Sequence, residues 1–127
     1  MSAKRILIVD DEYRIREVIK LTLEMMAGWE VLMADSGAEG LSIAELEQPD
    51  AILLDMMMPD MDGTVTLRYL QANLATQQIP VLLLTAKLPI GGEPQFTQLG
   101  AKAVIPKPFD PLSLANQIAE ILGWELS

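Results

Sequence analysis

Short apolar runs recur along the chain and predict β-strands. The three strongest runs cover residues 6–9, 51–55 and 81–85, and each is a stretch of Val, Ile, Leu or Ala that leads into a polar side chain. Unbroken apolar runs of this length are typical of parallel strands that helices cover on both faces. Two weaker runs, at residues 31–34 and 103–105, complete a set of five predicted strands.

The segments between these runs carry the spacing of amphipathic helices, with apolar residues every three to four positions. The positions expected to be buried in four helices are, in chain order, Ile15, Val18, Ile19, Thr22 and Met26, then Leu41, Ile43 and Ala44, then Leu67, Leu70 and Leu74, and finally Leu114, Ile118, Ile121 and Leu122. Gly28 and Gly123 are placed to end the first and the last of these helices. A capping box at residues 36–39 opens the second helix, and Asp110 followed by Pro111 opens the last one.

The segment after residues 81–85 has a weaker helical pattern. Residues 88–95 contain two prolines and two glycines, which disfavour a helix. We therefore expect a loop there, and a helix only from about residue 93 to 99.

With this helix included, predicted strands and helices alternate five times along the chain. Because βαβ crossovers are right-handed, this order predicts an α/β fold, a doubly wound five-stranded parallel sheet with five helices, as a single domain over residues 1–127 with its core at 5–122.

Composition narrows the function classes of a chain whose 127 residues suit about one domain. The absence of cysteine and histidine excludes disulfides, thiolate nucleophiles, His-ligated metals and a phosphohistidine carried by this chain. The formal net charge of −9 argues against direct binding to nucleic acid. No apolar run approaches the roughly 20 residues of a membrane span, and the N-terminus lacks a signal-peptide pattern. We expect a cytoplasmic protein that does not bind membranes.

Polar side chains at the ends of the predicted strands are the candidates for chemistry, because ligands of such sheets bind beyond the carboxyl ends of the strands. Asp10 and Asp11 follow the first strand, and Asp55 ends the third. Adjacent strands would bring these carboxylates together, and a hard divalent cation such as Mg²⁺ relieves the repulsion of crowded like charges. The alternative is that Asp10 and Asp11 are a solvated pair at a helix N-terminus and that Asp55 is a cap or turn residue.

A carboxylate directly after an apolar strand is also a candidate nucleophile. Asp55 would accept a phosphoryl group and form an acyl phosphate. Such transfer needs a cation and a hydroxyl around the transferred oxygens, and Lys107 and Thr85 offer these groups at the ends of the fifth and fourth strands. Taken singly, Thr85 is more often a strand-end residue and Lys107 a solvated loop charge. Their joint placement at strand ends favours a site.

Four motifs, in this order, resemble the receiver domain of bacterial two-component response regulators. They are Ile8-Val-Asp-Asp-Glu12, Leu54-Asp-Met-Met-Met-Pro-Asp-Met-Asp-Gly63, Leu84-Thr-Ala86 and Lys107-Pro-Phe109. The resemblance covers essentially the whole chain, from residue 6 to about residue 122. It implies a flavodoxin-like sheet with the strand order 2-1-3-4-5.

The resemblance also implies the residues that hold a metal ion. Asp55 is expected to be the phosphoacceptor and, together with Asp11 and the backbone carbonyl of Met57, to bind Mg²⁺ directly. Asp10 is expected to act mostly through metal-bound water.

For the other candidates the resemblance implies contacts with the phosphoryl group. Lys107 would pair with the carboxylate and then with the phosphoryl group, and Thr85 would close on a phosphoryl oxygen. The Lys107–Pro108 peptide is often cis in this family.

Val104 is a departure from the family pattern, because the family commonly carries Tyr or Phe at this place, and that ring rotates inward as the threonine moves. A stiff valine cannot swing in this way, which puts the aromatic part of the output switch in question.

These residues together suggest a stand-alone response regulator receiver. It would accept a phosphoryl group on Asp55 from a histidine kinase or a His-containing phosphotransfer protein in a Mg²⁺-dependent reaction, and would then switch binding to a downstream protein target. Such a module catalyses its own phosphorylation and dephosphorylation and is not a conventional enzyme. The alternative is a non-phosphorylated adaptor for protein interactions that uses the same fold.

One further motif, Asp60-Met-Asp-Gly-Thr64, matches the signature of haloacid-dehalogenase-like phosphatases. That signature directly follows a strand, whereas Pro59 separates Asp60 from the strand at residues 51–55. The chain also lacks room for the insertions of that family. We therefore expect no phosphatase site on Asp60.

Overall fold

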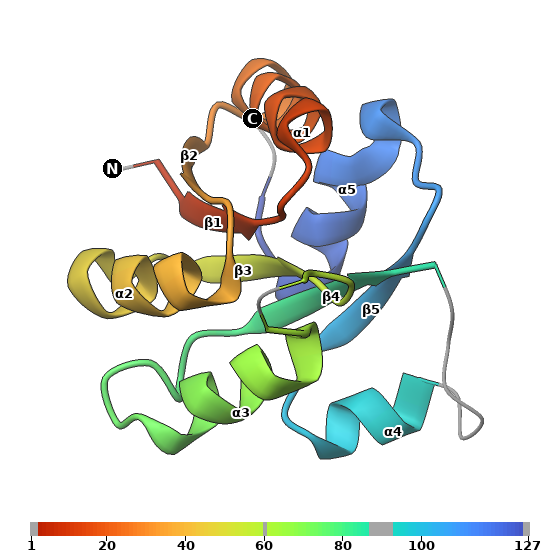
Figure 1. The fold of residues 1–127 in the computed structure, drawn as a ribbon. Helices are drawn as coiled ribbons and strands as arrows, with labels where there is room; N and C mark the ends of the chain where they lie inside the picture. The colour runs from red at the N-terminus through yellow and green to blue at the C-terminus, as the bar shows by residue number, and fades with distance from the viewer. Residues whose placement is uncertain (1–2, 60, 87–92, 126–127) are drawn as a thin grey trace.

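The computed structural model describes residues 3–59, 61–86 and 93–125. Within these ranges five strands form one parallel sheet in the order β2-β1-β3-β4-β5 (Figure 1). The elements are β1 (Arg5–Val9), α1 (Tyr13–Ala27), β2 (Glu30–Ala34), α2 (Gly37–Glu47), β3 (Ala51–Asp55), α3 (Gly63–Ala72), β4 (Val81–Thr85), α4 (Glu93–Gln98), β5 (Ala103–Pro106) and α5 (Pro111–Leu122). The predicted α/β class, the parallel sheet and its strand order are confirmed.

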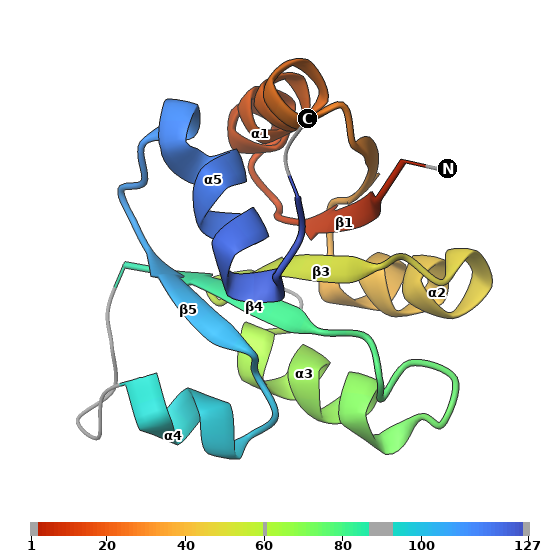
Figure 2. The same ribbon diagram turned by 180° about the vertical axis from the view of Figure 1, so that it is seen from behind.

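Helices cover both faces of the sheet, as the apolar strands predict. The helices α1 and α5 lie on one face, whereas α2, α3 and α4 lie on the other (Figures 1 and 2). Side chains alternate between the two faces along a strand. Ile6 and Ile8 of β1 therefore belong to the core beneath α1 and α5, and Leu7 and Val9 belong to the opposite core.

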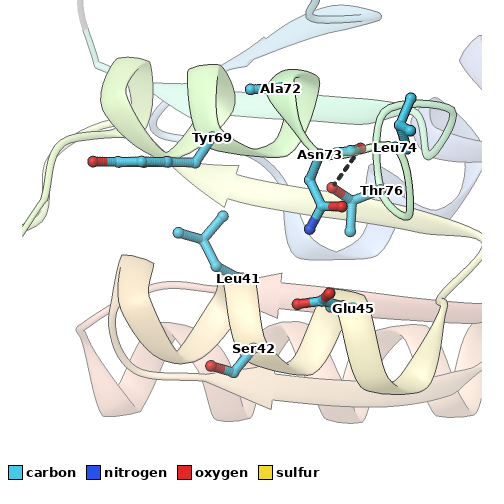
Figure 3. A pocket seen from close by; sticks show the side chains of 8 residues that line it. All are labelled: Leu41, Ser42, Glu45, Tyr69, Ala72, Asn73, Leu74 and Thr76. Carbon is cyan, nitrogen blue, oxygen red and sulfur yellow. Dashed lines mark hydrogen bonds between the residues drawn. The ribbon is translucent and has the colours of Figure 1, made fainter.

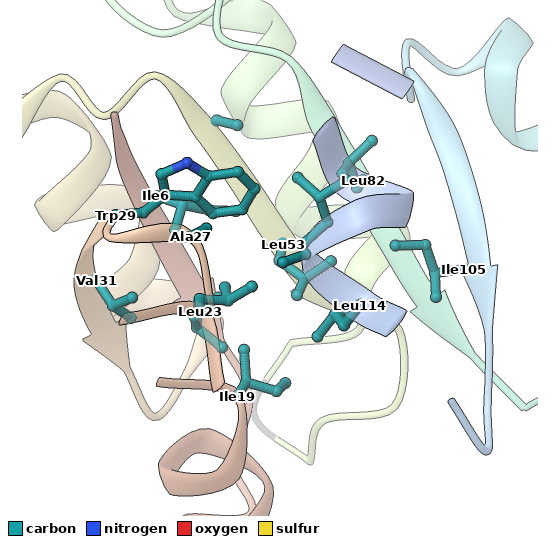
Figure 4. Close-up of a cluster of buried hydrophobic side chains, with 14 of the residues drawn as sticks. Ile6, Ile19, Leu23, Ala27, Trp29, Val31, Leu53, Leu82, Ile105 and Leu114 are labelled. Atoms are coloured by element: carbon teal, nitrogen blue, oxygen red, sulfur yellow. The ribbon is translucent and has the colours of Figure 1, made fainter. Parts of the chain in front are cut away.

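Figure 4 shows the core on the side of α1 and α5. It combines Ile19 and Leu23 of α1 with Leu53 of β3 and Leu114 of α5, all of them fully buried. Each such side chain contributes about 1.5–3 kcal/mol to folding through removal of apolar surface from water. This packing fixes the positions of β1 and β3, whose carboxyl ends carry the acidic candidates.

The buried face of α1 differs from the predicted one. Val18 and Met26 were expected in the core but are 42% and 47% exposed. The buried residues are Ile19, Leu23 and Ala27, which are spaced four residues apart. A helix that packs obliquely on its neighbours is contacted along such a row of i, i+4 side chains, and this row winds around the helix axis.

A second correction concerns Leu74, which was expected on the buried face of the third helix but is 83% exposed. The reason is that α3 ends at Ala72, so Leu74 lies in the loop that follows. Thr76 is buried in this loop instead, and its hydroxyl donates to the carbonyl oxygen of Leu70 at 2.8 Å.

The predicted helix boundaries are mostly confirmed. Ser36 caps α2 by accepting a hydrogen bond from the backbone N–H of Glu39, and Asp110 caps α5 in the same way. Gly28 and Gly123 follow α1 and α5 in the left-handed conformation, with φ of 70° and 72°. In this conformation a residue with a Cβ is strained.

The remaining differences are small. The helix expected at residues 93–99 ends one residue earlier, at Gln98, and the loop expected at residues 88–92 lies outside the described residues. None of the helices in the described ranges has both the length and the apolar character that a bilayer crossing demands.

Candidate functional site

The acidic candidates meet at one edge of the sheet. Asp10 follows β1 and Asp55 ends β3, and these two strands are hydrogen-bonded neighbours. One carboxylate oxygen from each of Asp10, Asp11 and Asp55 lies within 4.8 Å of the others. The carboxyl ends of neighbouring parallel strands thus bring together three carboxylates from two distant segments of the chain.

Asp55 is almost fully buried, with 1% of its surface exposed. Its Oδ1 accepts hydrogen bonds from the backbone N–H of Met57 at 3.1 Å and from the ammonium of Lys107 at 3.0 Å. Its Oδ2 has no hydrogen-bond donor in the described part of the chain. One oxygen of Asp55 is therefore fixed in place, while the other remains available to a ligand or a reacting group.

Asp10 shows the same division between its two oxygens. Its Oδ1 accepts a hydrogen bond from the backbone N–H of Glu12 at 2.8 Å, whereas its Oδ2 has no hydrogen-bond donor among the described residues. The ammonium of Lys107 lies 3.9 Å from that Oδ2. Asp10 is completely buried, while Asp11 is exposed.

Burial makes the charged form of Asp10 costly. The pKa of its carboxyl is raised from 3.8 to about 6, chiefly because burial disfavours the anion, with a smaller contribution from the charge of Asp55. The hydrogen bond from Glu12 and the charge of Lys107 oppose this rise. Among the described residues, a single ammonium, that of Lys107, lies within 4.0 Å of these carboxylates, so with Asp10, Asp11 and Asp55 ionised this part of the site has a deficit of positive charge.

Lys107 and Thr85 lie at the same edge. The backbone N–H of Lys107 donates to the carbonyl oxygen of Thr85 at 2.8 Å, and the Lys107–Pro108 peptide is cis, as the resemblance implied. Thr85 is buried at the end of β4, one residue beyond Leu84, which pairs with Asp55. The fourth and fifth strands therefore bring a hydroxyl and an ammonium to the edge that carries the carboxylates.

The side chain of Met57 points to solvent and is 73% exposed. Its backbone N–H binds Asp55, as described above. The role expected for its backbone carbonyl as a metal ligand stays a prediction.

Gly63 supports the loop after Asp55, a contact that the apolar pattern did not reveal. Its backbone N–H donates to the carbonyl oxygen of Met56 at 3.0 Å. A Cβ at this position would lie 2.8 Å from the Cα of Met56 and 3.1 Å from the carbonyl oxygen of Asp55. A glycine is therefore required for α3 to start so close to the phosphoacceptor candidate.

We expect Gly63→Ala to lower the free energy of unfolding by about 1–3 kcal/mol, because the added methyl group displaces backbone atoms. Urea unfolding measures the loss, and the amide resonances of Asp55 and Met57 should shift. Thr64→Ala is the matched control at the next residue. Equal stability of Gly63→Ala and the parent protein, with unchanged amide resonances, would show that the close approach is not required.

Asp62, which belongs to the motif that matches haloacid-dehalogenase-like phosphatases, is the N-cap of α3. The carboxylate of Asp62 accepts a hydrogen bond from the backbone N–H of Val65 at 3.0 Å and so caps α3. Asp60 lies outside the described residues. The cap explains the second aspartate of this motif without any catalytic role.

The surface of the described residues has two hollows of similar size. One, of about 580 Å³, lies between α2 and α3 and contains none of the acidic candidates (Figure 3). The other, of about 480 Å³, lies beside the ammonium-bearing Lys107. Its lining, which is mostly apolar, consists of Arg14, Ile15, Val18, Ala86, Lys107, Pro108, Phe109 and Pro111.

A family model described as the response regulator receiver domain matches residues 6–119, so the chain belongs to this family. Among curated proteins it is 40% identical over 122 residues to the phosphate regulon transcriptional regulatory protein PhoB of Pseudomonas aeruginosa, covering 96% of this chain and 53% of that protein. It is 37% identical to the alkaline phosphatase synthesis transcriptional regulatory protein PhoP of Bacillus subtilis, covering 94% and 47%. The chain thus spans about half the length of the curated relatives it matches.

Solved structures of receivers share the fold over nearly their whole length. The chemotaxis protein CheY4 of Vibrio cholerae aligns with a TM-score of 0.86 at 29% identity, covering 94% of this chain and 99% of that one. A CheY-like receiver domain protein from Methanospirillum hungatei aligns with a TM-score of 0.86 at 34% identity, covering 96% and 95%.

Proposed function

We propose that this chain is a phosphorylation switch that accepts a phosphoryl group on Asp55 and thereby changes its binding to a downstream protein. The observation that carries the proposal is the Asp55 carboxylate. It is buried, Lys107 and Met57 hold its Oδ1, and its Oδ2 has no donor among the residues that the structure describes. Two further carboxylates lie beside it. A structural ion pair would need neither the free oxygen nor the additional acids.

In the transfer step, Oδ2 of Asp55 attacks the phosphorus of a phosphohistidine on a histidine kinase or phosphotransfer protein. The new P–O bond forms as the P–N bond breaks, and the imidazole of the donor leaves with the bonding electron pair. Lys107, already 3.0 Å from the carboxylate, offsets the negative charge that arrives. Thr85 would then donate its hydroxyl hydrogen to a phosphoryl oxygen and transmit the change to its strand.

The donor set fits Mg²⁺. Hard oxygen ligands and an excess of negative charge suit this ion. Three carboxylates lie within 4.8 Å of one another here, and Oδ2 of Asp10 has no hydrogen-bond donor in the described residues. Asp11, Asp55 and the backbone carbonyl of Met57 would hold the ion, and Asp10 would contact its water. When bound, Mg²⁺ supplies charge neutralisation for the transferred phosphoryl oxygens.

The hollow beside Lys107 offers a contact surface for a protein phosphodonor. It combines exposed Val18 of α1 with Pro108 and Phe109, which directly follow the lysine. A donor that packs against these apolar side chains would place its phosphohistidine next to Lys107 and Asp55. The identification of the donor as a histidine kinase or phosphotransfer protein is part of this proposal.

Incubation with a small phosphodonor such as acetyl phosphate tests the proposed function. We expect incorporation of one phosphoryl group per chain, dependent on Mg²⁺ and abolished by a chelator, because the reaction needs positioning and charge neutralisation. The phosphate should be labile, as expected of an acyl phosphate. An intact, folded protein that takes up no phosphate at saturating donor and Mg²⁺ would instead favour the non-phosphorylated adaptor.

Several expectations from the sequence belong to this proposal. They are the single-domain, stand-alone organisation over residues 1–127, the cytoplasmic location, the absence of direct binding to nucleic acid, and self-catalysed phosphorylation and dephosphorylation without conventional enzyme activity.

Val104 is partly buried and packs against the core beneath α2 and α3. The proposed output therefore does not depend on a rotating aromatic ring at this position.

A further inference from the structure

Asp10 is held through nearly all of its polar groups. Its backbone N–H donates to the carbonyl oxygen of Ala34 at 3.1 Å, and its Oδ1 accepts from the backbone N–H of Glu12. Arg16 provides the third contact, because its Nη1 donates to the backbone carbonyl oxygen of Asp10 at 2.7 Å. Only Oδ2, the oxygen that faces Lys107, is left without a hydrogen bond to the described residues.

The turn that contains Asp10 and Asp11 has no ordinary helix cap. Glu12 occupies the N-cap position of α1 and makes no capping hydrogen bond with its side chain. The helices α2, α3 and α5, in contrast, all begin with a side-chain cap. The turn is therefore held by Asp10 itself, through Oδ1, and by Arg16. A change that loosens this turn also moves two of the three clustered carboxylates.

The side chain of Arg16 is placed for this contact. Its guanidinium carbon lies 5.7 Å from the centroid of the Tyr13 ring, and a cation at this distance from an aromatic face is attracted to it. Among the described residues, no carboxylate lies within 4.0 Å of the Arg16 guanidinium. Its charge therefore strengthens the hydrogen bond to the carbonyl oxygen of Asp10, as charged donors do.

From these contacts we infer that Arg16 is a positioning residue of the acidic site, which holds the turn at residues 10–12 in the geometry that Mg²⁺ binding requires. The inference rests on the proposed function, in which Asp11 and Asp55 hold the ion and Asp10 contacts its water. Arg16 touches neither the ion nor the phosphoryl group in this arrangement. It acts through the backbone of Asp10, as partners in the outer shell of a metal site do.

Calorimetric titration of the metal-free protein with Mg²⁺ tests this role. We expect Arg16→Met to weaken Mg²⁺ binding by about tenfold, the lower end of the range for the loss of an outer-shell partner. Arg68→Met is the matched control, because Arg68 is an exposed arginine on α3; it should change the affinity by less than about twofold. Arg16→Lys keeps a charged donor but loses the planar group that lies against Tyr13, so its affinity should fall between those of Arg16→Met and the parent protein.

Hydrogen exchange of the Glu12 amide gives a second readout that needs no metal. This amide donates to Asp10 within the turn, so it should exchange faster in Arg16→Met but not in Arg68→Met. The role of Arg16 is overturned if Arg16→Met and Arg68→Met bind Mg²⁺ equally and protect Glu12 equally. If Arg16→Met does not fold, Arg16→Lys and Arg16→Gln are compared instead. Slower exchange of the Glu12 amide in Arg16→Lys than in Arg16→Gln supports the role of Arg16, and equal exchange overturns it.

The two proposals fail in different ways. A parent protein that binds no Mg²⁺ contradicts the proposed function, whereas the exchange of the Glu12 amide still decides whether Arg16 holds the turn. A parent protein that binds Mg²⁺ and an Arg16→Met variant that binds it equally well contradict only the role of Arg16.

Discussion

Replacement of Asp55 by asparagine is expected to reduce phosphoryl incorporation to background. The amide keeps the size of the carboxylate but lacks its nucleophilic oxygen, so the loss should be roughly a thousandfold or more, as for other removed nucleophiles. Lys107 stands 3.0 Å from Oδ1 of Asp55. The other acids of the cluster, Asp10 and Asp11, lie close by, but in the proposed function they serve the metal ion and do not accept the phosphoryl group. Quantification of labelled protein after reaction with acetyl phosphate and Mg²⁺ measures this loss.

Asp62→Asn is the matched control for this experiment. It removes the same charge from the same segment, and Asp62 caps α3 without belonging to the acidic cluster. Asparagine is also a good cap, so this variant should fold and be labelled normally. Retention of stoichiometric labelling in Asp55→Asn, or loss of labelling in Asp62→Asn, would contradict the assignment of Asp55 as phosphoacceptor.

A second large effect concerns the dependence of stability on pH and Mg²⁺. The native pKa of Asp10 is about 6, against an ordinary value of 3.8. Between these values the native state binds more protons at this residue than the unfolded state, so the free energy of unfolding decreases as the pH rises. Ionisation of Asp10 should cost the metal-free protein about 3 kcal/mol above pH 6, relative to conditions below pH 4.

Mg²⁺ should reverse this trend, because it binds the ionised form of the native site. At a concentration one hundred times its dissociation constant it should stabilise the protein by about 2.7 kcal/mol near neutral pH. Urea unfolding between pH 4 and 7.5, with a chelator or with Mg²⁺, measures both effects.

Asp10→Asn provides the direct check on this second prediction. The metal-free variant should be more stable than the parent protein at pH 7, should lose most of the slope between pH 4 and 6, and should gain less from Mg²⁺. Glu45→Gln removes a carboxylate that lies in the exposed hollow between α2 and α3 (Figure 3). It should leave the slope unchanged. An identical slope in Asp10→Asn and the parent protein would contradict the buried, destabilising charge.

Much of this arrangement follows from local features of the sequence. The strands β3 and β4 have the predicted bounds. Unbroken apolar runs that end in a polar residue are typical of parallel strands covered by helices on both faces. Asp10, Asp11 and Asp55 could be placed at one edge once the sheet was known to be parallel, since the carboxyl ends of parallel strands lie together. The strand order itself came from the resemblance to receiver domains.

Other features depend on contacts that periodicity does not encode. The angle at which α1 packs on its neighbours decides which of its side chains are buried, and these include Leu23 and Ala27. Leu74 fits the period of α3 but follows its end. The contact between the Arg16 side chain and the backbone of Asp10 joins a side chain to a carbonyl group. A backbone acceptor has no signature in the sequence, so such contacts emerge only from the folded chain.

The proposed function requires that carboxylates from two distant segments and the amine of Lys107 surround one ion and one phosphoryl group. A crystal structure of the protein with Mg²⁺ and beryllofluoride, a mimic of the phosphoryl group, tests it most directly. We expect beryllofluoride on Asp55, the ion on Asp11, Asp55 and the carbonyl oxygen of Met57, and Lys107 against the fluorides. Beryllofluoride bound elsewhere, or an ion that contacts neither Asp11 nor Asp55, would contradict it.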